Sequence, residues 1–255
     1  MTTPAIVFVA GAWHTPAAYS KFASGLKALG HEVHIPSLPS MNGARPPNAD
    51  LNTDITLIRG YVESLTEAGR NVVVIMHSYG GQVGTDALVG LGAETRQKDG
   101  LPGGVIRLVY VCAYALTEGR SMFDMVKDMG HEALMPIAFD FAEDETVLDR
   151  DPKNLLVGPG LSEEELEAYV AGLKRWNGKP IYQPIGQCAW REIPVSYVYT
   201  LNDMTVPWDY QKVMVENMRA EGRQVKTLEV DTGHCPTITR TQELVDMVHG
   251  IVTAA

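Results

Sequence analysis

The chain has 255 residues, of which 45% are hydrophobic, and this length and composition suit one α/β domain with a sizeable core. Its formal net charge of −10 disfavours nucleic acid and anionic membrane surfaces as partners. Three scattered cysteines, Cys112, Cys188 and Cys235, lack the spacing of a disulfide framework or a metal site. The N-terminus shows no basic and apolar leader, and no apolar run is long enough to cross a bilayer. We therefore expect a cytoplasmic monomer or homodimer that binds neither nucleic acid nor membrane.

Short apolar strands alternate with amphipathic helices along most of the chain. The strands are predicted at residues 6–10, 31–35, 72–77, 105–112, 194–200 and 225–230. The clearest helical spacing joins Leu51, Ile55, Ile58, Val62 and Leu65. Such alternation predicts a doubly wound, mostly parallel six-stranded sheet with helices on both faces. Ligands of such sheets bind outside the C-terminal ends of the strands.

Residues 117–190 interrupt this alternation. The segment has an acidic middle, no convincing strand pattern and one helix that opens with a capping box at Ser162 and Glu165. We expect a largely helical lid inserted into a core domain made of residues 1–116 and 191–255. Its methionines predict either an adaptable apolar wall over a binding site or simple core filling: Met122, Met125, Met129 and Met135.

Ser78 stands where the third predicted strand turns abruptly into a helix. The apolar run from Val72 ends at His77-Ser78-Tyr79, and Gly80 and Gly81 follow. A serine on so tight a turn is forced outward, while the glycines avoid collisions with neighbouring backbone. The first helical N–H groups point at the same place and favour developing negative charge. The sequence therefore predicts a nucleophile, and the alternative is a serine that only caps the helix.

A base and an acid follow at matching positions on later strands. Asp203 comes after the strand at residues 194–200, and His234 comes after the strand at 225–230. The resulting chain order, serine, aspartate, histidine, is that of serine hydrolases on a parallel α/β sheet. Asp231 is a rival acid, but it precedes the histidine too closely to orient it from another strand. Cys235 adjoins His234, yet no strand–helix turn presents its thiol as a nucleophile.

These motifs resemble the α/β-hydrolase fold superfamily over nearly the whole chain. Within it the chain is most similar to small esterases related to plant methyl-ester hydrolases and hydroxynitrile lyases. The likeness rests on the segments 7–14, 190–194, 200–207 and 233–236. It implies that the backbone N–H groups of Ala12 and Tyr79 form the oxyanion hole.

The chain departs from the family pattern at several positions. It has Ala10 where the family usually has histidine, and Met76 where the family usually has glycine. We expect the small Ala10 to make room for the large Met76. The related hydroxynitrile lyases carry lysine directly after the histidine, where this chain has Cys235, so cyanohydrin cleavage is disfavoured. Ser78 argues against the superfamily's dehalogenases and epoxide hydrolases, whose nucleophile is aspartate.

The sequence thus predicts a serine hydrolase that cleaves a carboxylic ester or lactone of a small hydrophobic molecule. Ser78, Asp203 and His234 are the expected catalytic residues. No cofactor is required and no metal site is expected. The predicted pocket residues are Trp13, His14, His77 and Cys235. A lyase or cyclase, and a ligand receptor that retains the triad, remain the alternatives.

Overall fold

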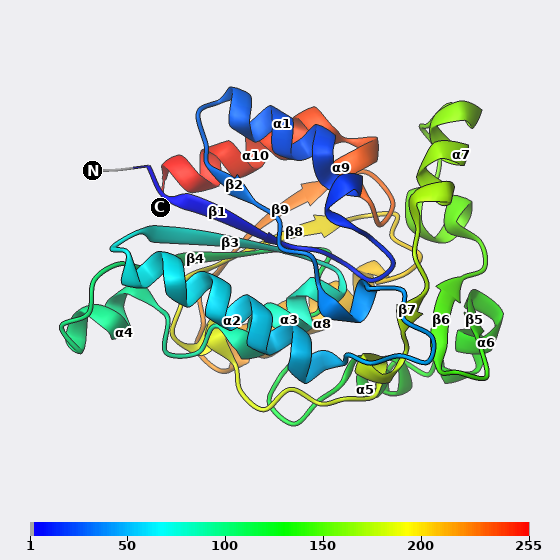
Figure 1. Cartoon of the computed structure of the whole chain (residues 1–255), viewed down its shortest axis with the longest axis horizontal. Helices are drawn as coiled ribbons and strands as arrows, with labels where there is room; N and C mark the ends of the chain where they lie inside the picture. The colour runs from blue at the N-terminus through cyan, green and yellow to red at the C-terminus, as the bar shows by residue number, and fades with distance from the viewer. Residues whose placement is uncertain (1–2, 255) are drawn as a thin grey trace.

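A computed structural model describes residues 3–254, and in it the six predicted core strands form one parallel sheet (Figure 1). The strand order is β2-β1-β3-β4-β8-β9, so the order reverses beside β1, as expected of a doubly wound sheet. The strands are β1 (Ala5–Val9), β2 (Val33–His34), β3 (Asn71–His77), β4 (Gly104–Val111), β8 (Val195–Thr200) and β9 (Val225–Val230). The predicted fold class is confirmed.

Helices cover both faces of this sheet. One face carries α1 (Ser20–Ala28), α9 (Pro236–Thr239) and α10 (Thr241–Thr253), and the other carries α2 (Leu51–Glu67), α3 (Tyr79–Ala87) and α8 (Trp208–Ala220) (Figure 1). A short helix, α4 (Ala93–Lys98), precedes β4, and 3-10 turns span Pro16–Tyr19 and Pro39–Met41. Within residues 3–254, every helix is too short or too polar to span a lipid bilayer.

Each sheet face has its own apolar cluster because successive strand side chains point to opposite faces. Val9 and Met76 are paired in register and pack in the cluster beneath α2 and α3, whereas Ala10 packs in the cluster beneath α1 and α10. The expectation that Ala10 makes room for Met76 is therefore wrong. The space comes from Gly84 in α3, where an added Cβ would lie 2.4 Å from the Met76 sulfur.

The inserted segment, residues 117–190, lies beyond the C-terminal ends of the core strands (Figure 1). Its helices are α5 (Met122–Asp128), α6 (Met135–Ala138) and α7 (Glu163–Gly172), with one-turn helices at Glu132–Leu134, Lys153–Val157, Lys179–Ile181 and Ala189–Arg191. The capping box that begins α7 is formed by Ser162 and Glu165, as predicted.

The insertion also contains a small antiparallel sheet that the sequence did not reveal. Its strands are β5 (Phe139–Phe141), β6 (Thr146–Asp149) and β7 (Trp176–Asn177). The Trp13 indole donates to the Val147 carbonyl at 3.1 Å, which fixes this sheet to the loop after β1. The division at residues 117 and 190 stays a prediction, and residues 1–2 and 255 of the predicted core lie outside the described residues.

Candidate active site

Ser78 occupies a strained turn between β3 and α3. Its φ of 53° and ψ of −122° lie in a region that non-glycine residues rarely adopt. An added Cβ at Gly80 would lie 2.3 Å from the Val9 carbonyl oxygen, and one at Gly81 would lie 2.7 Å from the Tyr114 nitrogen. Only glycine fits at either position without moving backbone, which is why the turn can be so tight.

Two backbone N–H groups next to Ser78 are free to bind an anion. The N–H groups of Ala12 and Tyr79 have no acceptor within residues 3–254, and both residues line the same cavity as Ser78. The neighbouring Gly11 N–H is occupied by the Tyr19 hydroxyl at 2.9 Å. The two N–H groups predicted to form the oxyanion hole therefore face the same cavity as Ser78.

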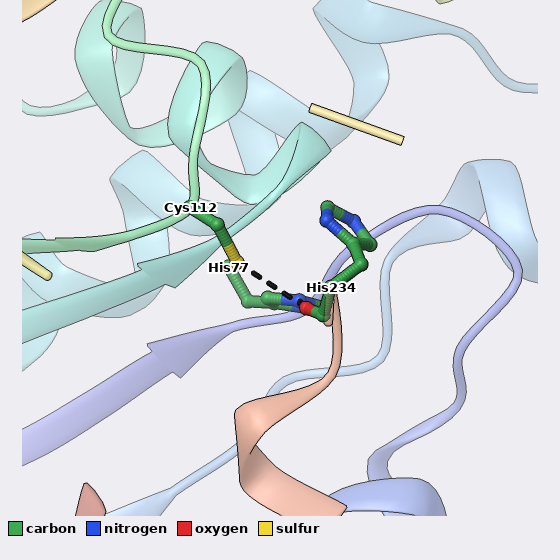
Figure 2. Close-up of side chains that lie close together, drawn as sticks. All are labelled: His77, Cys112 and His234. Atoms are coloured by element: carbon green, nitrogen blue, oxygen red, sulfur yellow. Dashed lines mark hydrogen bonds between the residues drawn. The ribbon is translucent and has the colours of Figure 1, made fainter. Parts of the chain in front are cut away.

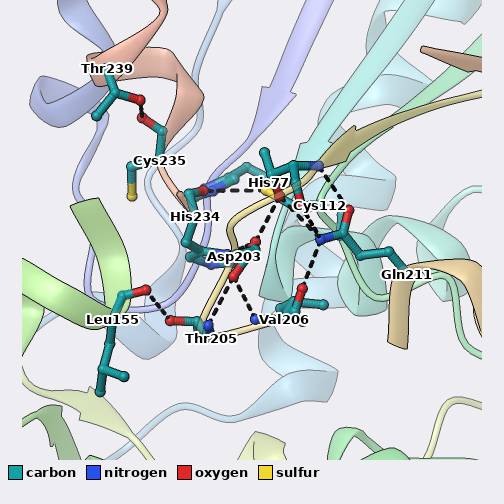
Figure 3. A network of polar contacts seen from close by, with 12 residues as sticks. His77, Cys112, Leu155, Asp203, Thr205, Val206, Gln211, His234, Cys235 and Thr239 are labelled. Carbon is teal, nitrogen blue, oxygen red and sulfur yellow. Dashed lines mark hydrogen bonds and ion pairs between the residues drawn. The ribbon is translucent and has the colours of Figure 1, made fainter. Parts of the chain in front are cut away.

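Asp203 and His234 meet as the chain order predicts, although they are 31 residues apart (Figure 3). The His234 Nδ1 lies 2.7 Å from the Asp203 Oδ2, and both side chains are buried. The same carboxylate accepts the N–H groups of Thr205 and Val206 at 2.8 and 2.7 Å. These bonds fix the carboxylate, which in turn fixes the imidazole.

The rival acid does not reach the histidine. Asp231 is exposed, and its Oδ1 accepts the Asn202 side-chain amide at 2.5 Å. Ser78 Oγ makes no hydrogen bond to His234 in the described part of the chain. Such bonds are commonly long in free enzymes and tighten when substrate binds.

A chain of buried hydrogen bonds supports the backbone of His234. The Tyr19 hydroxyl, which accepts the Gly11 N–H, lies 3.0 Å from His77 Nδ1, and His77 Nε2 lies 2.8 Å from the His234 carbonyl oxygen. Burial lowers the pKa of His77 well below its usual range, so the ring is neutral and donates through Nε2. These hydrogen bonds thus connect the loop after β1 to the loop after β9.

Figure 2 shows the Cys112 thiol pointing at the same carbonyl oxygen, at 3.2 Å. His77, Cys112 and His234 place potential metal-ligand atoms within 4.8 Å of one another. Both nitrogens of His77 are engaged in hydrogen bonds, and burial raises the pKa of the Cys112 thiol well above its usual range. The side chains of His77 and Cys112 support the backbone of His234, and their hydrogen bonds occupy the atoms that a metal would need.

Three of the four predicted pocket residues lie behind the cavity instead of in its wall. His77 holds His234, and His14 bridges the Ala12 carbonyl oxygen at 2.6 Å and the Tyr169 hydroxyl at 2.8 Å. Cys235 lies 3.4 Å from the same hydroxyl. Burial lowers the pKa of His14 to about 4 and raises the pKa of Cys235 to about 12, so both are uncharged near neutral pH. The pocket assignment of these three is corrected.

The cavity has a volume of about 240 Å³ and is mostly apolar. Trp13 lines it as predicted, while the insertion and the loop after β8 supply most of the wall. Of the four methionines, Met122 and Met135 line the cavity, and Met125 and Met129 do not. The wall residues that sequence reasoning missed are Tyr114, Val126, His131, Leu134, Ala138, Phe139, Trp176, Ile181, Met204, Thr205, Pro207 and Tyr210.

A buried carboxylate that was not predicted anchors the side chain of Tyr79. Asp54 Oδ2 accepts the Tyr79 hydroxyl at 2.7 Å, and Oδ1 accepts the Ser40 backbone N–H at 2.9 Å. The Ser40 hydroxyl donates to Asp54 and accepts the Trp176 indole N–H at 3.1 Å. The sequence holds a sign of this network, because Asp54 falls on the apolar face of α2 with Leu51 and Ile58.

These features belong to a known class of protein. The family model described as "Alpha/beta hydrolase family" matches residues 6–247, so the chain belongs to that family. It is similar to "Probable hydrolase R7" of Phoma sp. (29% identity, 97% of this chain, 98% of the relative) and to "Alpha/beta hydrolase nvfD" of Aspergillus novofumigatus (29% identity, 97% and 96%). It also superposes on the crystal structure of the methylesterase protein MES16 from Arabidopsis with a TM-score of 0.72, at 15% identity, covering 99% of this chain and 100% of that one.

The predicted resemblance is thereby confirmed. The protein is a hydrolase of the α/β-hydrolase family with esterase-like structural neighbours.

Proposed function

We propose that the protein is a serine-dependent hydrolase of carboxylic esters or lactones, with Ser78, His234 and Asp203 as its catalytic triad. The observation that carries this proposal is the buried 2.7 Å contact between His234 and Asp203, beside a strained Ser78 whose cavity also receives two free N–H groups. A helix-capping serine would need none of these partners.

In the proposed reaction His234 removes the Ser78 proton as the hydroxyl oxygen attacks the substrate carbonyl. The developing oxyanion is bound by the N–H groups of Ala12 and Tyr79, each worth about 3 kcal/mol of barrier. His234 then gives the proton to the leaving alcohol, and the acyl–Ser78 ester forms. A water activated by His234 cleaves that ester and restores the enzyme. Asp203 orients the ring and stabilises its charged form. No cofactor takes part.

The cavity supports a small hydrophobic substrate. Its wall is built largely from aliphatic and aromatic side chains, and Trp13 makes aromatic contacts with both Phe139 and Trp176. Burial of apolar surface is the main source of affinity in such a pocket. Leu134 and Met204, which line the cavity, are more than half exposed and leave an apolar approach to it. Residues 117–190 act in this proposal as the lid.

The test is ester hydrolysis by the purified protein with a series of small aryl and alkyl esters. Ser78→Ala, His234→Ala and Asp203→Asn should each lower kcat by about 10⁴-fold or more. Asp231→Asn and Cys235→Ala are matched controls, and they should retain most of the activity. Turnover that persists in Ser78→Ala would contradict the proposal. Tight ligand retention with a single turnover would favour a receptor instead.

A further inference from the structure

The cavity contains a second group of polar side chains besides Ser78. Tyr114, His131 and Tyr210 all line it. Tyr114 follows β4, and its backbone N–H donates to the Ser78 carbonyl oxygen at 3.1 Å, so this tyrosine adjoins the nucleophile turn. Tyr210 comes from the first turn of α8. His131 comes from the insertion, between α5 and the turn at Glu132–Leu134. Core and insertion therefore both contribute to this group.

The Tyr114 hydroxyl lacks a partner although the residue is only 7% exposed. It makes no hydrogen bond within residues 3–254, and its oxygen is not fully buried. Because the hydroxyl oxygen is not fully buried and the residue lines the cavity, the O–H group is open to the cavity and free to donate to a ligand there. Because the residue lines the cavity, whatever completes it must enter the cavity.

The two other members are held in place by each other. His131 Nδ1 lies 2.9 Å from the Tyr210 hydroxyl, and the two rings stack at 5.7 Å with an angle of 17°. Tyr210 is 3% exposed, so its hydroxyl is held away from bulk solvent. Since α8 belongs to the core and His131 to the insertion, this contact also fixes the insertion over the cavity.

The charges of the cavity wall restrict what these groups can bind. The wall residues include no lysine, arginine, aspartate or glutamate. Burial raises the pKa of Tyr114 and Tyr210, that of Tyr210 to about 12, so both hydroxyls stay protonated. Tyr114 can donate to a ligand, and Tyr210 can do so when His131 Nδ1 donates the hydrogen of the bond that they share. A free carboxylate would find no lysine or arginine there, whereas a neutral carbonyl oxygen would accept a tyrosine O–H without needing a counter-charge.

We infer that Tyr114, with the His131–Tyr210 pair, forms a specificity site for a second neutral oxygen in an otherwise apolar ester or lactone, above all a ketone carbonyl. The inference rests on the proposed ester hydrolysis and names its substrate class. A site that donates to a substrate oxygen discriminates against the analogue that lacks this oxygen, because the donor is then left buried and unpaired.

The test compares ethyl hexanoate with its three analogues that carry a ketone at C3, C4 or C5 of the acyl chain. We expect the wild-type kcat/KM to favour at least one keto analogue over the plain ester by about tenfold. Tyr114→Phe should abolish this ratio, because kcat/KM for the keto ester falls about tenfold more than kcat/KM for the plain ester. Tyr210→Phe should reduce the ratio. Tyr182→Phe is the matched control, since Tyr182 is an exposed tyrosine of the insertion outside the cavity wall, and it should keep the ratio.

A binding measurement separates this inference from the proposed function. Calorimetric Kd values for the same esters with Ser78→Ala should show the same preference, and Ser78→Ala/Tyr114→Phe should lose it. No keto preference in either assay, or a preference that survives Tyr114→Phe, would overturn the inference. If the preference appears only as Kd, with no turnover by the wild type, the proposed hydrolysis fails while the specificity site stands.

Discussion

Asp149 gives the sharpest prediction about stability. It ends β6 in the insertion and is only 4% exposed. Its Oδ1 accepts the Asp151 backbone N–H at 2.8 Å, while Oδ2 has no partner in the described residues. Burial raises the pKa of Asp149 from 3.8 to about 6, against smaller opposing effects of that hydrogen bond and of His234. An asparagine at this position keeps the Oδ1 acceptor and never carries charge.

The size and sign of the effect follow from this pKa difference. The folded protein binds the Asp149 proton more tightly than the unfolded chain does, so the free energy of unfolding falls as pH rises between about 4 and 6. A difference of about two pKa units corresponds to about 3 kcal/mol. Below that window the protonated side chain costs nothing, and above pH 6 the full cost of the buried charge is present. Asp149→Asn should therefore stabilise the protein at pH 8 by up to about 3 kcal/mol and change little at pH 4.

The assay is urea unfolding of wild type and Asp149→Asn at pH 4, 5, 6 and 8, followed by circular dichroism. Glu143→Gln is the matched control, because Glu143 is an exposed acid of the same insertion. The difference in free energy of unfolding between Glu143→Gln and the wild type should not grow with pH. If Asp149→Asn destabilises the protein equally at every pH, the carboxylate has a partner in solution and the reasoning is refuted.

Three further substitutions test the turn, its anchor and the acid. Gly80→Ala should destabilise the protein by more than about 3 kcal/mol in urea unfolding, since the new Cβ would lie 2.3 Å from a carbonyl oxygen of β1; a fully stable variant would show that the turn can relax. Tyr79→Phe should lower the free energy of unfolding by about 1.5–3 kcal/mol, because the Asp54 carboxylate loses a hydrogen bond. The double variant Asp54→Asn/Tyr79→Phe should lose less stability than the two single variants lose together. Strict additivity of the two losses would contradict the coupling. Asp203→Asn should lower kcat about 10⁴-fold with an unchanged unfolding midpoint, and an equal loss in Asp231→Asn would remove the assignment of the acid.

The core sheet could be predicted from sequence because its strands are five to eight residues long in most cases, apolar and separated by helical periodicity. A parallel sheet then brings the ends of β3, β8 and β9 to one edge, which is why Ser78, Asp203 and His234 could be placed together from chain order. The long separations of Ser78, Asp203 and His234 in the sequence did not hinder this prediction.

Other features depend on contacts that leave little trace in the chain. Strands β5, β6 and β7 have only two to four residues, too few for alternation to show. The pairing of Ala10 with Met76 failed because register puts Met76 opposite Val9, and neighbours along a strand face opposite sides. The partner of Met76 is Gly84 in α3, six residues after the nucleophile Ser78, and only packing reveals it.

The cavity wall was the least predictable part of the site. His14, His77 and Cys235 adjoin key residues in sequence, but they pack behind them, since consecutive side chains diverge. His131 and Tyr210 are 79 residues apart and meet only because the insertion folds back on α8.

The measurement that tests the central claim most directly is covalent labelling with a fluorophosphonate, followed by peptide mapping. Such a probe phosphonylates a serine whose hydroxyl is activated by a neighbouring base and whose oxyanion has donors. We predict one adduct per chain, on Ser78, that disappears in Ser78→Ala and is strongly slowed in His234→Ala. An adduct on another residue, or undiminished ester turnover by a protein whose Ser78 stays unlabelled, would contradict the account.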